Sequence, residues 1–164
     1  MSAIVACFGN VLKGDDGFGI AVAALLSEDP LPPDVQLMEI GIGGIHLVQA
    51  LLDGVDLLLV VDALDLGRPA GTVLVQRPEV LDVSTLPIDV RRDQLADMHL
   101  ATPARALMMA LGLGVLPPVT LVVGVQTTDT ERLGTELSPL TAAAVPVAAA
   151  QVRSLLALHL PVGT

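Results

Sequence analysis

Short apolar runs alternate with amphipathic segments along this 164-residue chain, and that alternation is typical of an α/β protein. The runs at residues 4–8, 35–40 and 119–125 suit strands that are covered on both faces. After each of them, apolar residues recur every three or four positions, as in helices that pack against a sheet. Residues 56–63 form the clearest central strand. We therefore expect mainly parallel strands with helices between them.

The remaining segments complete the predicted fold. Residues 72–76 follow residues 56–63 too closely for a crossover helix, which indicates an antiparallel edge strand. Prolines and scattered acids predict a long loop over residues 77–97 that closes over the site. Helices are expected from Thr102-Pro103 and from Ser138-Pro139, with either a kink at Pro146 or a start after it. Together these strands and helices predict one domain over residues 1–164. Its fold is a three-layer α/β/α sandwich around a mixed, mostly parallel five-stranded sheet.

The amino-acid composition limits the kinds of molecule that this protein can bind. A formal net charge of −10 repels nucleic acid and anionic membranes, and two Phe with no Trp or Tyr give little for bases to stack on. A metal cation, a small molecule or a protein remains. The N-terminus lacks a targeting pattern and charges interrupt the apolar runs, so we expect a cytoplasmic protein with no membrane segment. Cys7 is the only cysteine, and its place in a strand predicts an inert core residue.

The segment at residues 4–20 is the most informative part of the sequence. A strand breaks there into a glycine-rich turn that holds Asp15 and Asp16 before a helix begins. In open α/β sheets, ligands bind at this carboxyl edge of the strands. Acids in a first helical turn also stabilise the helix dipole, and that is an equal interpretation of Asp15. Asp62 ends the central run at the same edge, where burial of an acid is costly unless it is solvated or paired.

Several common chemistries do not fit these residues. Gly9 and Gly14 have phosphate-loop spacing, but two carboxylates follow where that motif has Lys and Ser or Thr. No dinucleotide fingerprint or serine-nucleophile elbow is present. A receiver-like signalling domain has a similar set of acids, yet it also needs a lysine after its last strand, and the only lysine is Lys13.

Asp16, Asp62 and His99 remain as two carboxylates and one imidazole on separate elements. Such a set suits a borderline divalent cation such as nickel or zinc. Glu39 and His46 are further candidates at the same edge. The residues by themselves therefore predict a metal-dependent hydrolase or a metal-binding domain.

In order along the chain, several blocks resemble the hydrogenase maturation endopeptidases: residues 9–19 (GNVLKGDDGFG), 61–63 (VDA), His99, 123–126 (VGVQ) and 137–139 (LSP). The resemblance implies removal of a C-terminal peptide from the large-subunit precursor of a [NiFe] hydrogenase, after nickel is installed. It also implies that Asp16, Asp62 and His99 bind the metal and serve catalysis. Nickel would then arrive within the substrate, with no organic cofactor, and the protein is expected to act as a monomer.

Two features depart from the family pattern. Pro103 follows His99 by four residues, so this histidine is expected on a loop or just before a helix, and His46 is a substitute. No residue stands out as a dedicated nucleophile or general base. A metal-binding or client-binding maturation module without proteolysis therefore remains an alternative.

Overall fold

The computed structural model describes residues 1–41, 44–96 and 102–160. Five strands form one sheet in the order β2-β1-β3-β5-β4. β4 pairs antiparallel to β5, and the other neighbours are parallel. The strands are β1 (Ala3–Phe8), β2 (Val35–Ile40), β3 (Leu57–Leu64), β4 (Val73–Gln76) and β5 (Val119–Gln126). The mixed, mostly parallel five-stranded sheet is confirmed, including its antiparallel edge.

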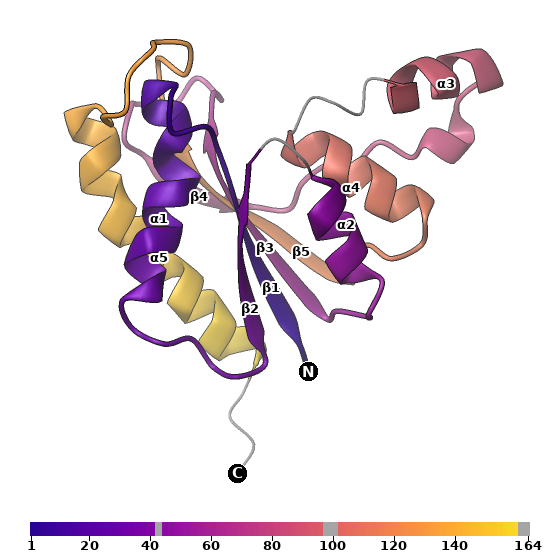
Figure 1. Ribbon diagram of the computed structural model, residues 1–164, viewed down its shortest axis with the longest axis horizontal. Coiled ribbons are helices and arrows are strands. Elements are labelled where there is room, and N and C mark those ends of the chain that lie inside the picture. The colour runs from indigo at the N-terminus through magenta and orange to yellow at the C-terminus, as the bar shows by residue number, and fades with distance from the viewer. Residues whose placement is uncertain (42–43, 97–101, 161–164) are drawn as a thin grey trace.

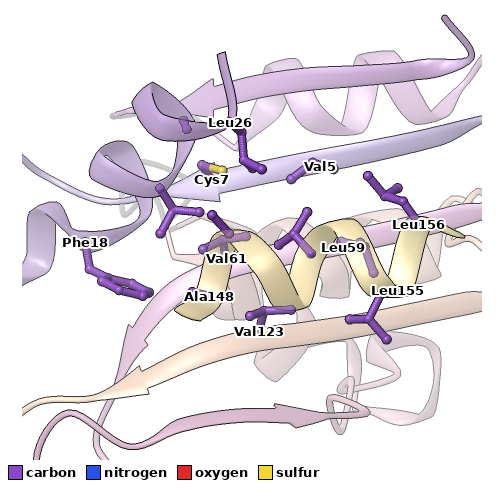
Figure 2. Close-up of a cluster of buried hydrophobic side chains, with 14 of the residues drawn as sticks. Val5, Cys7, Phe18, Leu26, Leu59, Val61, Val123, Ala148, Leu155 and Leu156 are labelled. Carbon is purple, nitrogen blue, oxygen red and sulfur yellow. The ribbon is translucent and has the colours of Figure 1, made fainter. Parts of the chain in front are cut away.

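Helices cover both faces of the sheet (Figure 1). α1 (Phe18–Ser27) and α5 (Pro139–His159) lie on one face, and α2 (Ile45–Leu51) and α4 (Pro103–Gly112) lie on the other. Alternate strand residues enter the two cores, as the two-residue period of a strand requires. Figure 2 shows the first core, where Val5, Leu59 and Val123 meet side chains of α1 and α5. The three-layer α/β/α sandwich is therefore confirmed.

α5 is the one helix in the described residues that is long and apolar enough to cross a membrane, with 21 residues and a mean hydropathy of 1.4. Helices in the cores of soluble proteins have the same composition. Here Ala148, Val152 and Leu156 are buried against the sheet. Arg153, near the end of the helix, donates hydrogen bonds to the carbonyl oxygens of Leu26 and Asp29. α5 thus shares one side of the core with α1.

The long loop predicted for residues 77–97 is wrong. This segment contains a 3₁₀ turn, η2 (Val83–Thr85), and a helix, α3 (Ile88–Ala96), which projects beyond α4 (Figure 1). The Asp82 carboxylate accepts hydrogen bonds from the backbone N–H and hydroxyl of Ser84, and Arg91 bonds the carbonyl oxygens of Val83 and Ser84. Polar contacts hold the segment, so no apolar period marks it in the sequence.

The two predicted helix starts are confirmed at Pro103 and Pro139. Thr102 and Ser138 have the extended backbone of N-cap residues, and neither side chain makes a capping hydrogen bond. α5 also runs through Pro146, so of the two alternatives expected there, a start of the helix after this proline is wrong, and a kink at it stays a prediction. Proline lacks the N–H that would bond one turn back, and the burial of residues on both sides of it offsets that loss.

α1 approaches the strands closely at Gly19. A Cβ atom at Gly19 would collide with the carbonyl oxygen of Phe8 and lie 2.8 Å from that of Val61. Both are backbone atoms of buried strands, Phe8 at the end of β1 and Val61 inside β3, so they have little freedom to move. Glycine here lets α1 lie directly against these two strands, and it fixes the position of the preceding turn.

We expect Gly19→Ala to lower the free energy of unfolding by about 3 kcal/mol, because the methyl group overpacks a rigid contact. Chemical denaturation of the purified protein measures this. Gly41→Ala is the matched control, since a Cβ atom there meets nothing within 4 Å. Equal stability of the two variants would show that α1 does not need this close approach.

Candidate active site

A cleft of about 540 Å³ opens at the carboxyl edge of the sheet. Its walls come from the turn after β1, the ends of β2 and β3, and the start of α4. The polar residues that line it are Asn10, Lys13, Asp16, Glu39, Asp62 and Thr102. Asp16 and Asp62 thus lie in one cleft, as their positions after β1 and near the end of β3 predict.

The glycine turn, residues 9–17, has its own hydrogen bonds. The backbone N–H of Asn10 donates to both the carbonyl oxygen and the side-chain Oδ2 of Asp16, at 3.2 Å each. A Cβ atom at Gly9 would collide with that Asp16 carbonyl oxygen, and Gly9 has a φ of +149°. The Asn10 side chain accepts from the N–H of Leu12 at 3.0 Å. The turn therefore holds the Asp16 carboxylate at the cleft, with one oxygen bonded to backbone.

Burial raises the pKa of both acids in the cleft, and a nearby carboxylate adds to each shift: Glu131 for Asp16 and Asp16 for Asp62. Burial raises the pKa of Asp62 from 3.8 to about 7; the Asp16 carboxylate adds to this, while the N–H of Ala63 opposes it. Burial also raises the pKa of Asp16, against the N–H of Asn10 and the charge of Lys13. Two nearby carboxylates that resist ionisation are a common setting for acid–base chemistry or cation binding.

The other predicted site residues differ in their placement. Glu39 is exposed and lines the cleft, whereas His46 is exposed on α2 and does not line it. His99 lies outside the described residues. Cys7 is fully buried, and burial raises the pKa of its thiol to about 12, which is consistent with an inert core residue.

Asp15 has a different partner from the one that the helix-dipole interpretation gives it. It is only 4% exposed, and its carboxylate accepts hydrogen bonds from the backbone N–H of Ser138 at 2.6 Å and the Ser138 hydroxyl at 2.8 Å. This carboxylate therefore joins the glycine turn to the start of α5. The acid pair in the sequence marked the turn but gave no sign of a partner 123 residues away.

Gln126 is a second supporting residue that the sequence analysis did not assign a role. Its buried amide oxygen accepts hydrogen bonds from the N–H groups of Leu66 and Arg68, and its nitrogen donates to Asp65 Oδ1 and to the carbonyl of Thr127. These bonds hold the loop that follows β3, directly after the strand that carries Asp62. A polar residue at the end of an apolar strand was the available signal.

The described side chains do not form a complete metal site. Among residues 1–41, 44–96 and 102–160, no group of three or more His, Cys, Asp or Glu side chains is arranged to hold a metal ion. Asp16 and Asp62 are two carboxylates of the kind that can coordinate a metal through oxygen, and most transition-metal sites have at least one further nitrogen or sulfur ligand.

Comparison with known proteins decides the family. A family model described as hydrogenase maturation protease matches residues 20–155. The chain belongs to the hydrogenase maturation protease family. A crystal structure of a hydrogenase 2 maturation peptidase from a Thaumarchaeota archaeon is 31% identical, with a TM-score of 0.69 over 96% of this chain and 99% of the other. The hydrogenase maturating endopeptidase HybD from E. coli is 26% identical, with a TM-score of 0.73 over 95% and 92%.

Relatives found by sequence similarity support the same family. The hydrogenase expression/formation protein HupM of Azotobacter chroococcum is 35% identical over 130 residues, which are 79% of this chain and 59% of HupM. The chain thus spans less than two thirds of that relative. The family resemblance is confirmed, and a receiver-like signalling domain is not supported. The match to the family model includes Asp62 and begins after Asp16, so Asp16 is a candidate site residue on the geometry of the cleft alone.

We expect Asp15→Ala to destabilise the protein by about 2 kcal/mol, because the backbone N–H of Ser138 loses its partner at the start of α5. Asp15→Asn keeps an acceptor oxygen for that N–H and has a donor for the hydroxyl, so it should retain most of the stability. Thermal unfolding of the three proteins measures the difference. Equal losses of stability in both variants would mean that the negative charge of Asp15, not its hydrogen bonds, stabilises the contact with Ser138.

The raised pKa of Asp62 predicts a pH-dependent stability. Between pH 3.8 and about 7, the folded protein keeps a proton on Asp62 that the unfolded chain releases. The free energy of unfolding from this group therefore falls as pH rises through that window, by at most about 1.4 kcal/mol per pH unit. In chelator-treated samples, Asp62→Asn should be more stable than the parent at pH 8, and the advantage should shrink toward pH 4. Parallel pH profiles would show that Asp62 ionises normally in the fold.

Proposed function

We propose that this protein is an endopeptidase that removes the C-terminal extension of a [NiFe]-hydrogenase large-subunit precursor after nickel insertion. The observation that carries the proposal is the pair Asp16 and Asp62, two electrostatically coupled carboxylates in one cleft of a member of this family. Similar proteins include the E. coli hydrogenase maturating endopeptidase. Catalysis and metal recognition are assigned to Asp16, Asp62 and His99.

Nickel is part of the substrate in this proposal. Two carboxylates provide only part of a coordination sphere, and the sole cysteine is buried in β1. A nickel ion that the precursor already holds needs fewer ligands from the protease. His99 precedes the cleft-lining residue Thr102 by three positions, which supports its assignment as the third ligand.

The hydrolytic step then uses water. Cys7 is a buried thiol, and the Ser138 hydroxyl is bonded to Asp15 and Thr141, so neither is available as a nucleophile. Nickel held by the precursor would orient the scissile segment and would polarise its carbonyl group or a water. Next to that nickel Asp62 is a carboxylate, which can accept the proton of the attacking water. In this proposal the protein acts in the cytoplasm as a monomer. It uses no organic cofactor, and it binds neither nucleic acid nor a membrane.

We expect Asp16→Asn, Asp62→Asn and His99→Ala each to reduce processing of nickel-loaded precursor by at least about a hundredfold, because each removes a group that contacts the metal or the reacting atoms. Mass spectrometry of the large subunit follows release of the extension. Asp53→Asn is the matched control, since Asp53 is an exposed acid just beyond α2, at the opposite edge of the sheet.

Nickel itself is tested with the parent protein. After dialysis against metal-free buffer it should retain little nickel, and it should cut nickel-loaded precursor but not nickel-free precursor. Stoichiometric retained nickel, or equal cutting of both precursors, would contradict the substrate-supplied metal. Binding of loaded precursor without any cutting would instead favour a client-binding maturation module.

A further inference from the structure

Three exposed aliphatic side chains, Val11, Leu12 and Leu133, lie next to the cleft. We call them the apolar rim. Val11 and Leu12 belong to the glycine turn, and Leu133 belongs to the loop between β5 and α5. Figure 1 shows these two segments side by side at the carboxyl edge of the sheet. The rim is continuous with the site because Val11 itself lines the cleft.

Backbone hydrogen bonds hold the rim together. The N–H of Gly134 donates to the carbonyl of Leu12 at 3.0 Å, and the N–H of Gly14 donates to the carbonyl of Gly134 at 2.8 Å. Lys13 and Glu131 add an ion pair of 3.1 Å across the same two segments. The loop after β5 is therefore paired with the glycine turn, and its position is set before any partner binds. A preformed surface avoids part of the ordering cost of binding.

The side chains of the rim remain in water although their backbone is ordered. Leu12 is 61% exposed, Val11 48% and Leu133 82%. An isolated exposed leucine needs no explanation, but neighbouring apolar side chains at the mouth of an acidic cleft mark a binding surface. These three side chains do not stabilise the fold through burial, so their apolar surface is free to contact a ligand.

We propose that the apolar rim binds apolar side chains of the C-terminal extension of the hydrogenase precursor, next to the segment held in the cleft. This inference rests on the proposed function. The size of the rim favours a short extended segment, because interfaces between folded proteins take about 20–30 residues on each side. The rim is continuous with the cleft through Val11, so a peptide held in the cleft can extend onto it. The cleft recognises the metal, and the rim recognises the peptide that is removed.

Leucine-to-serine variants test the rim with matched controls. Leu12→Ser and Leu133→Ser are compared with Leu113→Ser and Leu158→Ser, whose parent leucines are 59% and 72% exposed. The control leucines lie at or just after the ends of α4 and α5, at the opposite edge of the sheet. Single-turnover cleavage of nickel-loaded precursor is measured against protease concentration. Each rim variant should raise the half-saturating concentration about tenfold, which corresponds to about 1.4 kcal/mol, with the maximal rate and melting temperature unchanged.

Controls that lose as much as the rim variants, or rim variants that match the parent, would overturn the proposal. Binding to the processed large subunit, which lacks the extension, identifies what docks on the rim. The four variants should bind it equally, and a selective loss for the rim variants would assign the rim to the folded body of the client instead. A parent protein that binds both nickel-loaded and nickel-free precursor but cuts neither would refute the proposed function. The order of affinities among the four variants would still show whether the rim binds the precursor.

Discussion

The buried hydrogen bonds between Asp15 and Ser138 are the constraint on which the site depends. They join the first turn of the chain to the start of its last helix, 123 positions further along the chain. The close contact of Gly19 with the backbone of Phe8 in β1 and Val61 in β3 fixes the position of the helix that follows the same turn. With both contacts in place, the turn has little freedom, and its two acids face different partners: Asp15 supports the fold, and Asp16 faces the cleft.

This division of labour between adjacent acids explains the electrostatics of the cleft. Asp15 is satisfied by two donors, whereas Asp16 receives only a backbone N–H and the nearby charge of Lys13. Asp62 is in a harsher environment, because burial and the Asp16 carboxylate both oppose its ionisation. A fold does not gain stability from such a pair, since neutral side chains of similar size would avoid the cost. Buried acids with raised pKa values are typical of functional sites, where they bind a ligand or take part in catalysis.

The sequence predicted the elements whose signals are local and apolar. All five strands, the antiparallel edge and the starts of α4 and α5 follow from apolar runs, short connections and proline at the first helical position. α3 was missed because Arg91 and Asp82, not an apolar stripe, secure its segment. Asp16 and Asp62 were found because an acid after a buried run is informative. The roles of Asp15 and Gln126 were not found, since each depends on partners far along the chain that only the fold brings near.

Under the proposed function, the raised pKa values also explain how metal is recognised. At neutral pH a large share of Asp62 carries a proton in the isolated protein, which limits the repulsion from Asp16. A divalent cation lowers the pKa of a nearby carboxylate, so nickel that enters with the precursor replaces the proton and binds two anions. A precursor without nickel brings no compensating charge and meets a partly protonated cleft. The two acids of the cleft therefore respond to the charge that the precursor brings.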